Sequence, residues 1–109
     1  MQELTYIEAT RQALHAEMES NPDIFVVGEG IGPRGGNYQT TVDLHEKFGD
    51  WRLRDVPISE RGFTSMCIGA AAAGLRPIID FMFLDFELDA FGEIYHQMTK
   101  LHWMSNGAV

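Results

Sequence analysis

Cysteine and basic residues are scarce in this sequence of 109 residues, and long apolar runs are missing. The single cysteine, Cys67, excludes an internal disulfide and fits a reducing compartment. No apolar run approaches the ~20 residues that a bilayer-spanning helix needs. Lys and Arg number 8 against 16 Asp and Glu, and the formal net charge of -8 argues against nucleic acid or an anionic membrane as partner.

The first residues, 1–12, also lack the marks of a targeting segment. They contain no apolar core of a secretory signal and too many acids for a transit peptide. We therefore expect a cytoplasmic protein, or one of the mitochondrial matrix if the source is eukaryotic.

Metal and nucleotide motifs are missing as well. The run Gly28-x-Gly30 does not continue as the dinucleotide fingerprint G-x-G-x-x-G, because the third glycine position is occupied by Pro33. In addition, no helix is predicted to begin directly after it. The stretch 28–37 is better interpreted as a mobile loop. None of the histidines has the H-x-x-x-H or H-E-x-x-H spacing of a zinc site, so no metal ligand is expected among His15, His45, His96 and His102.

What is present is enough apolar material, 45% of the residues, for one packed domain. Thr5 and Glu8 have the spacing of a capping box, which predicts the start of a helix. Ile7, Leu14 and Met18 recur on one face of this helix, and Asn21-Pro22-Asp23 ends it.

Strand and helix patterns alternate along the rest of the chain. Short β-rich runs predict strands at 24–27, 51–56 and 78–82, the first and last of them buried. Helices are predicted at 41–48, closed by Gly49, at 59–73, capped by Ser59 and stopped by Gly74, and at 85–103. This alternation predicts an α/β fold, a parallel sheet with helices on both faces.

The last third of the chain is crowded with large apolar side chains. Such density usually marks a core, and in a domain this small it also suggests a surface reserved for a partner. The members are several methionines and Phe81, Phe83, Phe86, Phe91, Tyr95 and Trp103. Because no closing strand follows Trp103, we expect a truncated chain.

Three segments together resemble one enzyme family. Residues 25–30 (FVVGEG), 55–63 (DVPISERGF) and 74–82 (GLRPIIDFM) are similar, in order and spacing, to the β subunit of the E1 component of 2-oxo acid dehydrogenases. This family includes the pyruvate, branched-chain and acetoin dehydrogenases. The resemblance covers nearly the whole chain, and one departure is Gly30, where the family usually carries a second acid.

The resemblance implies a domain assignment. Residues 1–109 would be the amino-terminal part of a thiamine-diphosphate-binding pyrimidine module, and the closing strand and the carboxyl-terminal domain would be absent. A lack of these parts puts the activity of the isolated chain in doubt.

Glu60 matches the glutamate that the family places against ring nitrogen N1′ of the aminopyrimidine. A carboxyl group in an apolar pocket suits that role, because burial raises its pKa and lets it share a proton. The ring can then activate its own 4′-amino group, which removes the C2 proton of the thiazolium. The alternative is a first-turn acid that favours the helix dipole, worth ~0.3–1 kcal/mol.

Four further residues would line the cofactor site by the same resemblance. Met82 and Phe86 match positions that pack against the aminopyrimidine, and the alternative, which is compatible with this role, is core packing at the end of a strand. Ile58 belongs to the motif that contains Glu60. Glu29 would lie near the cofactor and join an acidic link between paired sites, or else be an ordinary solvated turn acid.

Cofactors and partners also follow from the resemblance. The chain has no G-D-G…N element for Mg²⁺, so the ion and the diphosphate of thiamine diphosphate would be held by a separate E1 α subunit in an α2β2 assembly. The product acyl group would pass to lipoyl groups of an E2 partner. Two alternatives stay open: the pyrimidine-binding module of a transketolase-like enzyme, and an α/β fragment without catalysis.

Overall fold

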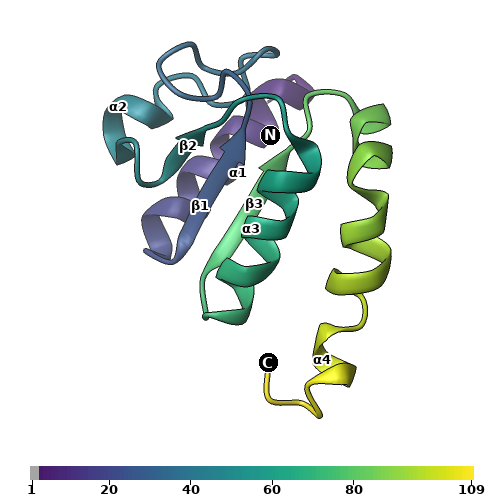
Figure 1. Ribbon diagram of the computed structural model, residues 1–109. Coiled ribbons are helices and arrows are strands. Elements are labelled where there is room, and N and C mark those ends of the chain that lie inside the picture. Colours follow the sequence, from purple (N-terminus) through teal and green to yellow (C-terminus); the bar gives the residue numbers. More distant parts are fainter. Residues whose placement is uncertain (1–2) are drawn as a thin grey trace.

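The computed structural model describes residues 3–109 and contains one three-stranded parallel sheet (Figure 1). The strand order is β2-β1-β3. The strands are β1 (Ile24–Gly28), β2 (Leu53–Asp55) and β3 (Arg76–Asp80). The helical segments are α1 (Tyr6–Ser20), α2 (Leu44–Phe48), α3 (Glu60–Ala72), the 3₁₀-helix η1 (Leu84–Ala90), the π-helix η2 (Glu93–Met98) and α4 (Leu101–Met104).

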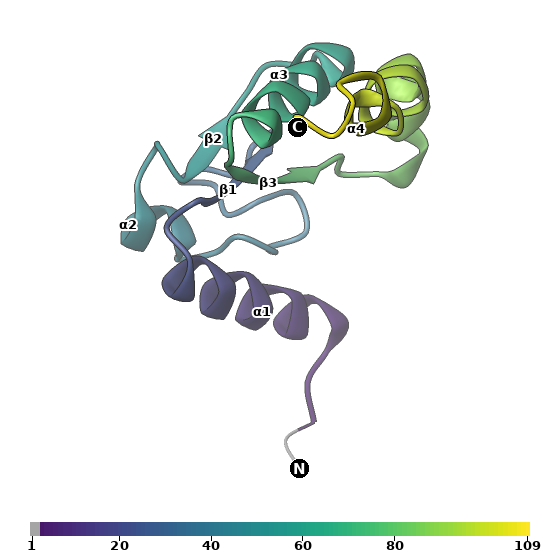
Figure 2. The same ribbon diagram turned by 90° about the horizontal axis from the view of Figure 1, so that it is seen from below.

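Helices cover both faces of the sheet, as the alternation of patterns predicts. Helix α1 lies on one face, while α3 and the helical segments that follow β3 lie on the other (Figure 2). The expected α/β class with a parallel sheet is confirmed. Within residues 3–109, no helix combines the length and the apolar content needed to cross a bilayer.

Helix α1 begins at the predicted capping box. The Glu8 amide donates to Thr5 Oγ1 at 3.2 Å, and the Thr5 amide donates to Glu8 Oε2 at 2.8 Å. The helix ends at Ser20, and the Asn21 amide closes its last turn on the Glu17 carbonyl. Both predicted boundaries are therefore confirmed.

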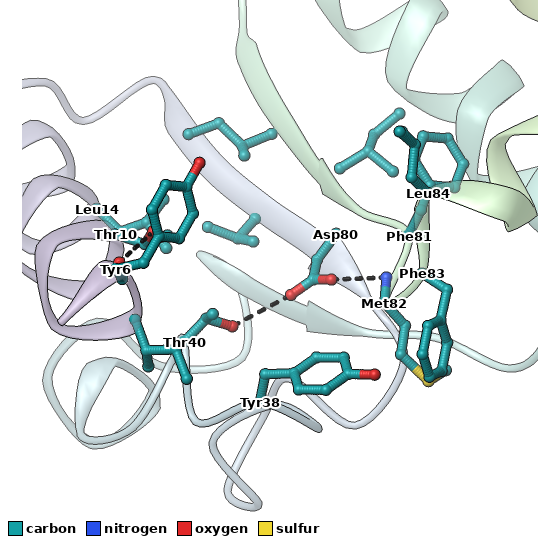
Figure 3. Close-up of a pocket in the computed structure, with 14 residues that line it drawn as sticks. Tyr6, Thr10, Leu14, Tyr38, Thr40, Asp80, Phe81, Met82, Phe83 and Leu84 are labelled. Atoms are coloured by element: carbon teal, nitrogen blue, oxygen red, sulfur yellow. Dashed lines mark hydrogen bonds between the residues drawn. The ribbon is translucent and has the colours of Figure 1, made fainter.

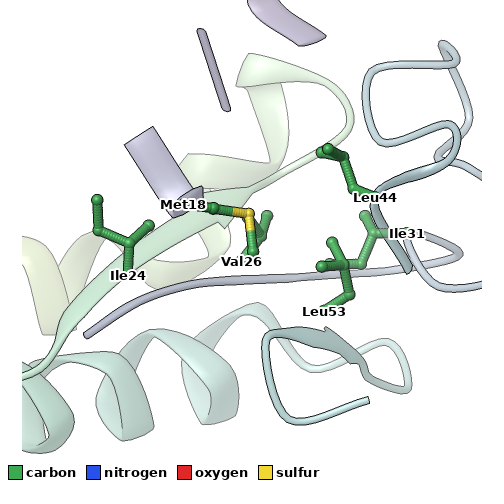
Figure 4. Packing of buried hydrophobic residues seen from close by; sticks show 6 residues of the cluster. All are labelled: Met18, Ile24, Val26, Ile31, Leu44 and Leu53. Carbon is green, nitrogen blue, oxygen red and sulfur yellow. The ribbon is translucent and has the colours of Figure 1, made fainter. Parts of the chain in front are cut away.

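Strand β1 is the centre of the core because all five of its residues are buried. Its side chains alternate between the faces, as in any strand. On the α1 side, Ile24 and Val26 pack with Met18, Ile31, Leu44 and Leu53 (Figure 4). On the α3 side, Phe25 and Val27 pack with Phe63 and Cys67. Cys67 is thus part of the core as a small buried hydrophobe, and burial raises the pKa of its thiol to about 11.

The predicted bounds of several elements are wrong by a few residues. Helix α2 starts at Leu44 rather than at residue 41, because Asp43 adopts a left-handed conformation with φ of +67°. Ser59 occupies the N-cap position of α3 without a capping hydrogen bond from its side chain. Gly74 ends that helix at φ of +100°, as expected.

The third predicted strand is displaced and less buried than expected. Strand β3 ends at Asp80 rather than at Met82, and its residues are exposed or only partly buried. The reason is its place in the sheet, where it pairs with β1 on one side alone. An apolar run predicts a strand but not whether that strand lies at the edge or in the centre.

The last predicted helix is interrupted. Residues 84–98 and 101–104 are helical, with a turn at 99–100, and the hydrogen-bond spacing differs among the 3₁₀-helix η1, the π-helix η2 and α4. Gly92, a poor helix former, lies at the first change. Near the second, Thr99 Oγ1 donates to the Tyr95 carbonyl at 2.6 Å, a side-chain bond that often bends helices.

The interpretation of the last third as core is also wrong for most of its large side chains. Phe81 is partly buried against the α3-side cluster. The others are exposed by about a third or more of their surface: Phe83, Leu84, Phe86, Leu88, Phe91, Tyr95, Met98, Trp103 and Met104. We call this set the exposed apolar face of the carboxyl-terminal helices.

Met18 provides a test of the α1-side cluster. Its side chain is 1% exposed, so Met18→Ala should leave a cavity and lower the free energy of unfolding by about 2–5 kcal/mol. The control Glu17→Ala alters an exposed neighbour on α1 and should change it by less than about 0.5 kcal/mol. Urea unfolding measures both, and equal effects would contradict the packing of α1 on the sheet.

Candidate functional site

The predicted site residues follow the carboxyl ends of the strands. Glu29 comes directly after β1, Ile58 and Glu60 come after β2, and Met82 and Phe86 come after β3. The strands are parallel, and Gly28 is in register with the last residues of both neighbours. All five predicted residues therefore follow the same edge of the sheet, where open α/β sheets bind ligands.

Glu60 is the first residue of α3 and its side chain is largely buried. Only 9% of the residue is exposed, and none of the ion pairs formed within residues 3–109 includes it. One turn further along, the Thr64 hydroxyl is buried with no hydrogen-bond partner among these residues. The Glu60 carboxyl and the Thr64 hydroxyl thus place two polar groups on one face at the start of α3.

Glu29 lies close enough to Glu60 for their charges to interact. Burial raises the pKa of the Glu29 carboxyl above its ordinary value, and the negative charges of Glu60 and Asp55 raise it further. Perturbed acids at a ligand-binding edge are typical of functional sites. The structure thus brings together the two acids that the sequence singled out separately.

The apolar residues of the predicted site are available for contact. Ile58 is 80% exposed in the β2–α3 connection. Phe86 is 36% exposed, and its ring meets Phe83 edge to face at 5.6 Å between centroids. Met82 adopts φ of +67°, which is strained for a side chain of this size, and its amide donates to Asp80 Oδ1 at 2.8 Å.

A cavity of about 480 Å³ adjoins Met82 on the α1 side of the sheet (Figure 3). Its polar groups include Tyr6, Thr10, Tyr38, Thr40 and Asp80. Thr40 Oγ1 donates to Asp80 Oδ2 at 3.3 Å, so this aspartate links the β1–α2 connection, which contains the glycine-rich loop 28–37, to the end of β3. The other four predicted site residues do not line the cavity.

Sequence reasoning missed the two aspartates that end β2 and β3. Asp55 belongs to the segment that carries the family resemblance, but the resemblance assigns it no role. For Asp80, the sequence predicts only a place in the buried strand 78–82. The available signal was their common place: each is the last residue of a strand flanking β1. Within residues 3–109, no group of three or more His, Cys, Asp and Glu side chains could hold a metal ion.

Comparison with known proteins adds independent findings. Residues 2–108 match the model of the transketolase pyrimidine-binding domain. The chain is 48% identical over 107 residues to the pyruvate dehydrogenase E1 component subunit beta of Chaetosphaeridium globosum, covering 98% of the chain and 33% of that protein. The corresponding subunit of Rickettsia conorii is 43% identical over 98% of the chain and 33% of its own length. The chloroplastic subunit beta-3 of Arabidopsis thaliana is 46% identical over 96% and 26%.

The chain therefore spans a third or less of the length of these curated relatives. What they share with it is the region that contains the strand-end edge described above.

The raised pKa of Glu29 predicts how stability depends on pH. Below the ordinary value of 4.5 the group is protonated in both the folded and the unfolded state and has no effect. As pH rises from 4.5 through the higher folded pKa, the unfolded state releases its proton more readily, so stability falls. Glu29→Gln should remove this fall.

Unfolding free energies measured from about pH 4 to about pH 7 test this expectation. The control Glu46→Gln removes one negative charge from an exposed position on α2. A Glu29→Gln profile parallel to that of the unsubstituted chain would show that Glu29 does not feel the burial and the neighbouring acids.

Proposed function

The chain belongs to the transketolase pyrimidine-binding domain family, and on that premise we propose that it is part of the β subunit of an E1 component of a 2-oxo acid dehydrogenase. Residues 1–109 would be the amino-terminal part of its pyrimidine-binding domain, with a carboxyl-terminal domain outside this sequence. The relatives compared above, all named pyruvate dehydrogenase E1 beta subunits, support this choice. The cofactor would be thiamine diphosphate.

One observation carries the proposal: at the ligand-binding edge of the sheet, Glu60 is largely buried, forms no ion pair within residues 3–109, and lies near enough to Glu29 for their charges to interact. An aminopyrimidine ring presents one flat apolar face and a ring nitrogen that can accept a proton. The residues fit such a ring, since Ile58, Met82 and Phe86 offer apolar surface and Glu60 offers a carboxyl group. The presence of two neighbouring acids favours retention of a proton at this place.

When bound, thiamine diphosphate supplies the nucleophilic thiazolium carbon that attacks the 2-oxo acid. Glu60 would hold a proton at N1′ of the aminopyrimidine. The nearby carboxyl group of Glu29 would favour retention of that proton, because two negative charges close together repel each other. Ile58, Met82 and Phe86 would orient the ring by stacking and exclude water from its face. The reaction would be decarboxylation of the 2-oxo acid with transfer of the acyl group to lipoyl groups.

The partners would be an E1 α subunit, in an α2β2 assembly, and a lipoyl-bearing E2. The diphosphate and its Mg²⁺ would be held by that separate chain, since no G-D-G…N element occurs in this sequence. The exposed apolar face of the carboxyl-terminal helices offers a surface that burial in an assembly would stabilise. The compartment would be the cytoplasm, or an organelle if the source is eukaryotic, as the chloroplastic name of one relative illustrates.

Two other functions differ from this proposal in their cofactor binding. A pyrimidine-binding module of a transketolase-like enzyme would bind thiamine diphosphate without an E1 α subunit. An inert fragment would bind it under neither condition. Titration of the chain with thiamine diphosphate and Mg²⁺, with and without E1 α, separates these cases, and binding only with the partner supports the E1 assignment.

Glu60→Gln tests the role of the buried carboxyl group. In the assembled enzyme with the full-length β subunit, turnover of the 2-oxo acid should fall at least about 100-fold, because an amide cannot exchange a proton with N1′. The control Glu46→Gln, exposed on α2, should leave turnover unchanged. Steady-state kinetics at saturating thiamine diphosphate provide the measurement, and near-normal turnover of Glu60→Gln would refute the role.

A further inference from the structure

Asp55 ties the loop that carries Glu29 to the end of β2. Its Oδ1 accepts a hydrogen bond from the Gly30 amide at 2.8 Å, and its Oδ2 accepts one from the Gly32 amide at 3.2 Å. The next residue, Val56, donates its amide to the Gly28 carbonyl at 3.1 Å. Glu29 therefore lies between two residues whose backbones are both bound to the end of β2.

We propose that Asp55 is a positioning residue that fixes the backbone on both sides of Glu29 and so holds the Glu29 carboxyl at the end of β1, on the same edge of the sheet as Glu60. The inference rests on the proposed function, since it assigns Asp55 to the same site. Asp55 itself acts through Glu29 and would not touch the cofactor.

Two glycines allow the backbone of this loop to lie close to the Asp55 carboxylate. Gly30 has φ of +68°, a conformation that favours glycine, and a Cβ atom on Gly32 would lie 3.2 Å from Asp55 Oδ2. Two backbone amides bound to one ionised carboxylate are charge-assisted hydrogen bonds, the stronger kind. A glycine at both positions thus lets the chain approach the aspartate with two donors at once.

Further polar contacts to this part of the loop come from residues later in the same β1–α2 connection. The Thr41 hydroxyl donates to the Ile31 carbonyl at 2.8 Å, and the Gly36 amide donates to the Gly30 carbonyl at 2.9 Å. Another contact comes from Asn37. Its Nδ2 donates to the Glu29 carbonyl at 3.3 Å. Asn37 belongs to the same glycine-rich loop, so this contact braces the loop internally but cannot attach it to β2. The attachment of the loop to the segment that leads to Glu60 depends on Asp55 and on the Val56 amide.

The negative charge of Asp55 also acts on the carboxyl group of Glu29. It is one of the three causes that raise the pKa of Glu29, after burial and the charge of Glu60. Asp55 therefore both places the Glu29 carboxyl and favours its protonated form.

Asp55→Ala in the full-length subunit, assembled with E1 α, removes both hydrogen bonds. Hydrogen exchange of the amides in residues 28–37 should become about tenfold faster, because the loop loses the stabilisation of roughly one net hydrogen bond. The KM for thiamine diphosphate should rise about tenfold as well. A smaller folded fraction would lower kcat and leave this KM unchanged, so the KM separates positioning from a general loss of structure.

Asp43→Asn is the matched control. Asp43 is exposed, has no capping hydrogen bond, and has a left-handed backbone that asparagine tolerates, so exchange and KM should remain those of the unsubstituted enzyme. If Asp55→Ala does not fold, Asp55→Asn replaces it. The amide nitrogen of asparagine takes the place of one carboxylate oxygen and cannot accept a hydrogen bond, so one of the bonds to Gly30 and Gly32 is lost. Unchanged exchange in residues 28–37 in the folded variant would overturn the proposal.

A double-mutant cycle with Glu29→Gln tests whether Asp55 acts through Glu29. If it does, Asp55→Ala should raise the KM much less in the Glu29→Gln background than in the unsubstituted enzyme. Equal, additive effects would overturn the positioning role. The proposed function has a separate test. It would be refuted if turnover of the unsubstituted assembly did not depend on thiamine diphosphate. The exchange measurement would still report on the Asp55 contacts in that case.

Discussion

The backbone pairing of β1 with two parallel neighbours is the constraint on which the rest of this structure depends. Gly28 is in register with Asp55 on one side and with Asp80 on the other, so three strands end together. Parallel strands need crossover connections, and here these connections contain α2 and α3, which separate the residues of the edge by many positions in sequence. The acids Glu29 and Glu60 become neighbours because the strands before them are paired.

The local parts of the fold could be predicted from the sequence. The capping box of Thr5 and Glu8, the buried run of β1 and the stop at Gly74 each depend on residues within a few positions of one another. The candidate residues came largely from a family resemblance. Their common location at one edge of the sheet agrees with that resemblance, and their roles stay predictions.

The remaining features depend on contacts between distant residues, which local patterns do not contain. Strand β3 is partly exposed because it lies at the edge of the sheet, and the aromatic residues after it are exposed because no described element covers them. The hydrogen bonds of Asp55 to the amides of Gly30 and Gly32 cross more than twenty positions. Nothing in the spacing of a single aspartate reveals that two backbone amides will meet it.

The close approach at Gly28 has a consequence for how this edge can vary. A Cβ atom there would lie 2.7 Å from the Asp80 carbonyl oxygen, so even a methyl group would push β3 away from β1. Such a displacement would carry Asp80 with it and disturb its bonds to Thr40 and Met82. The tolerance of the sheet for side-chain volume at one position thus sets the spacing of residues that lie on different loops.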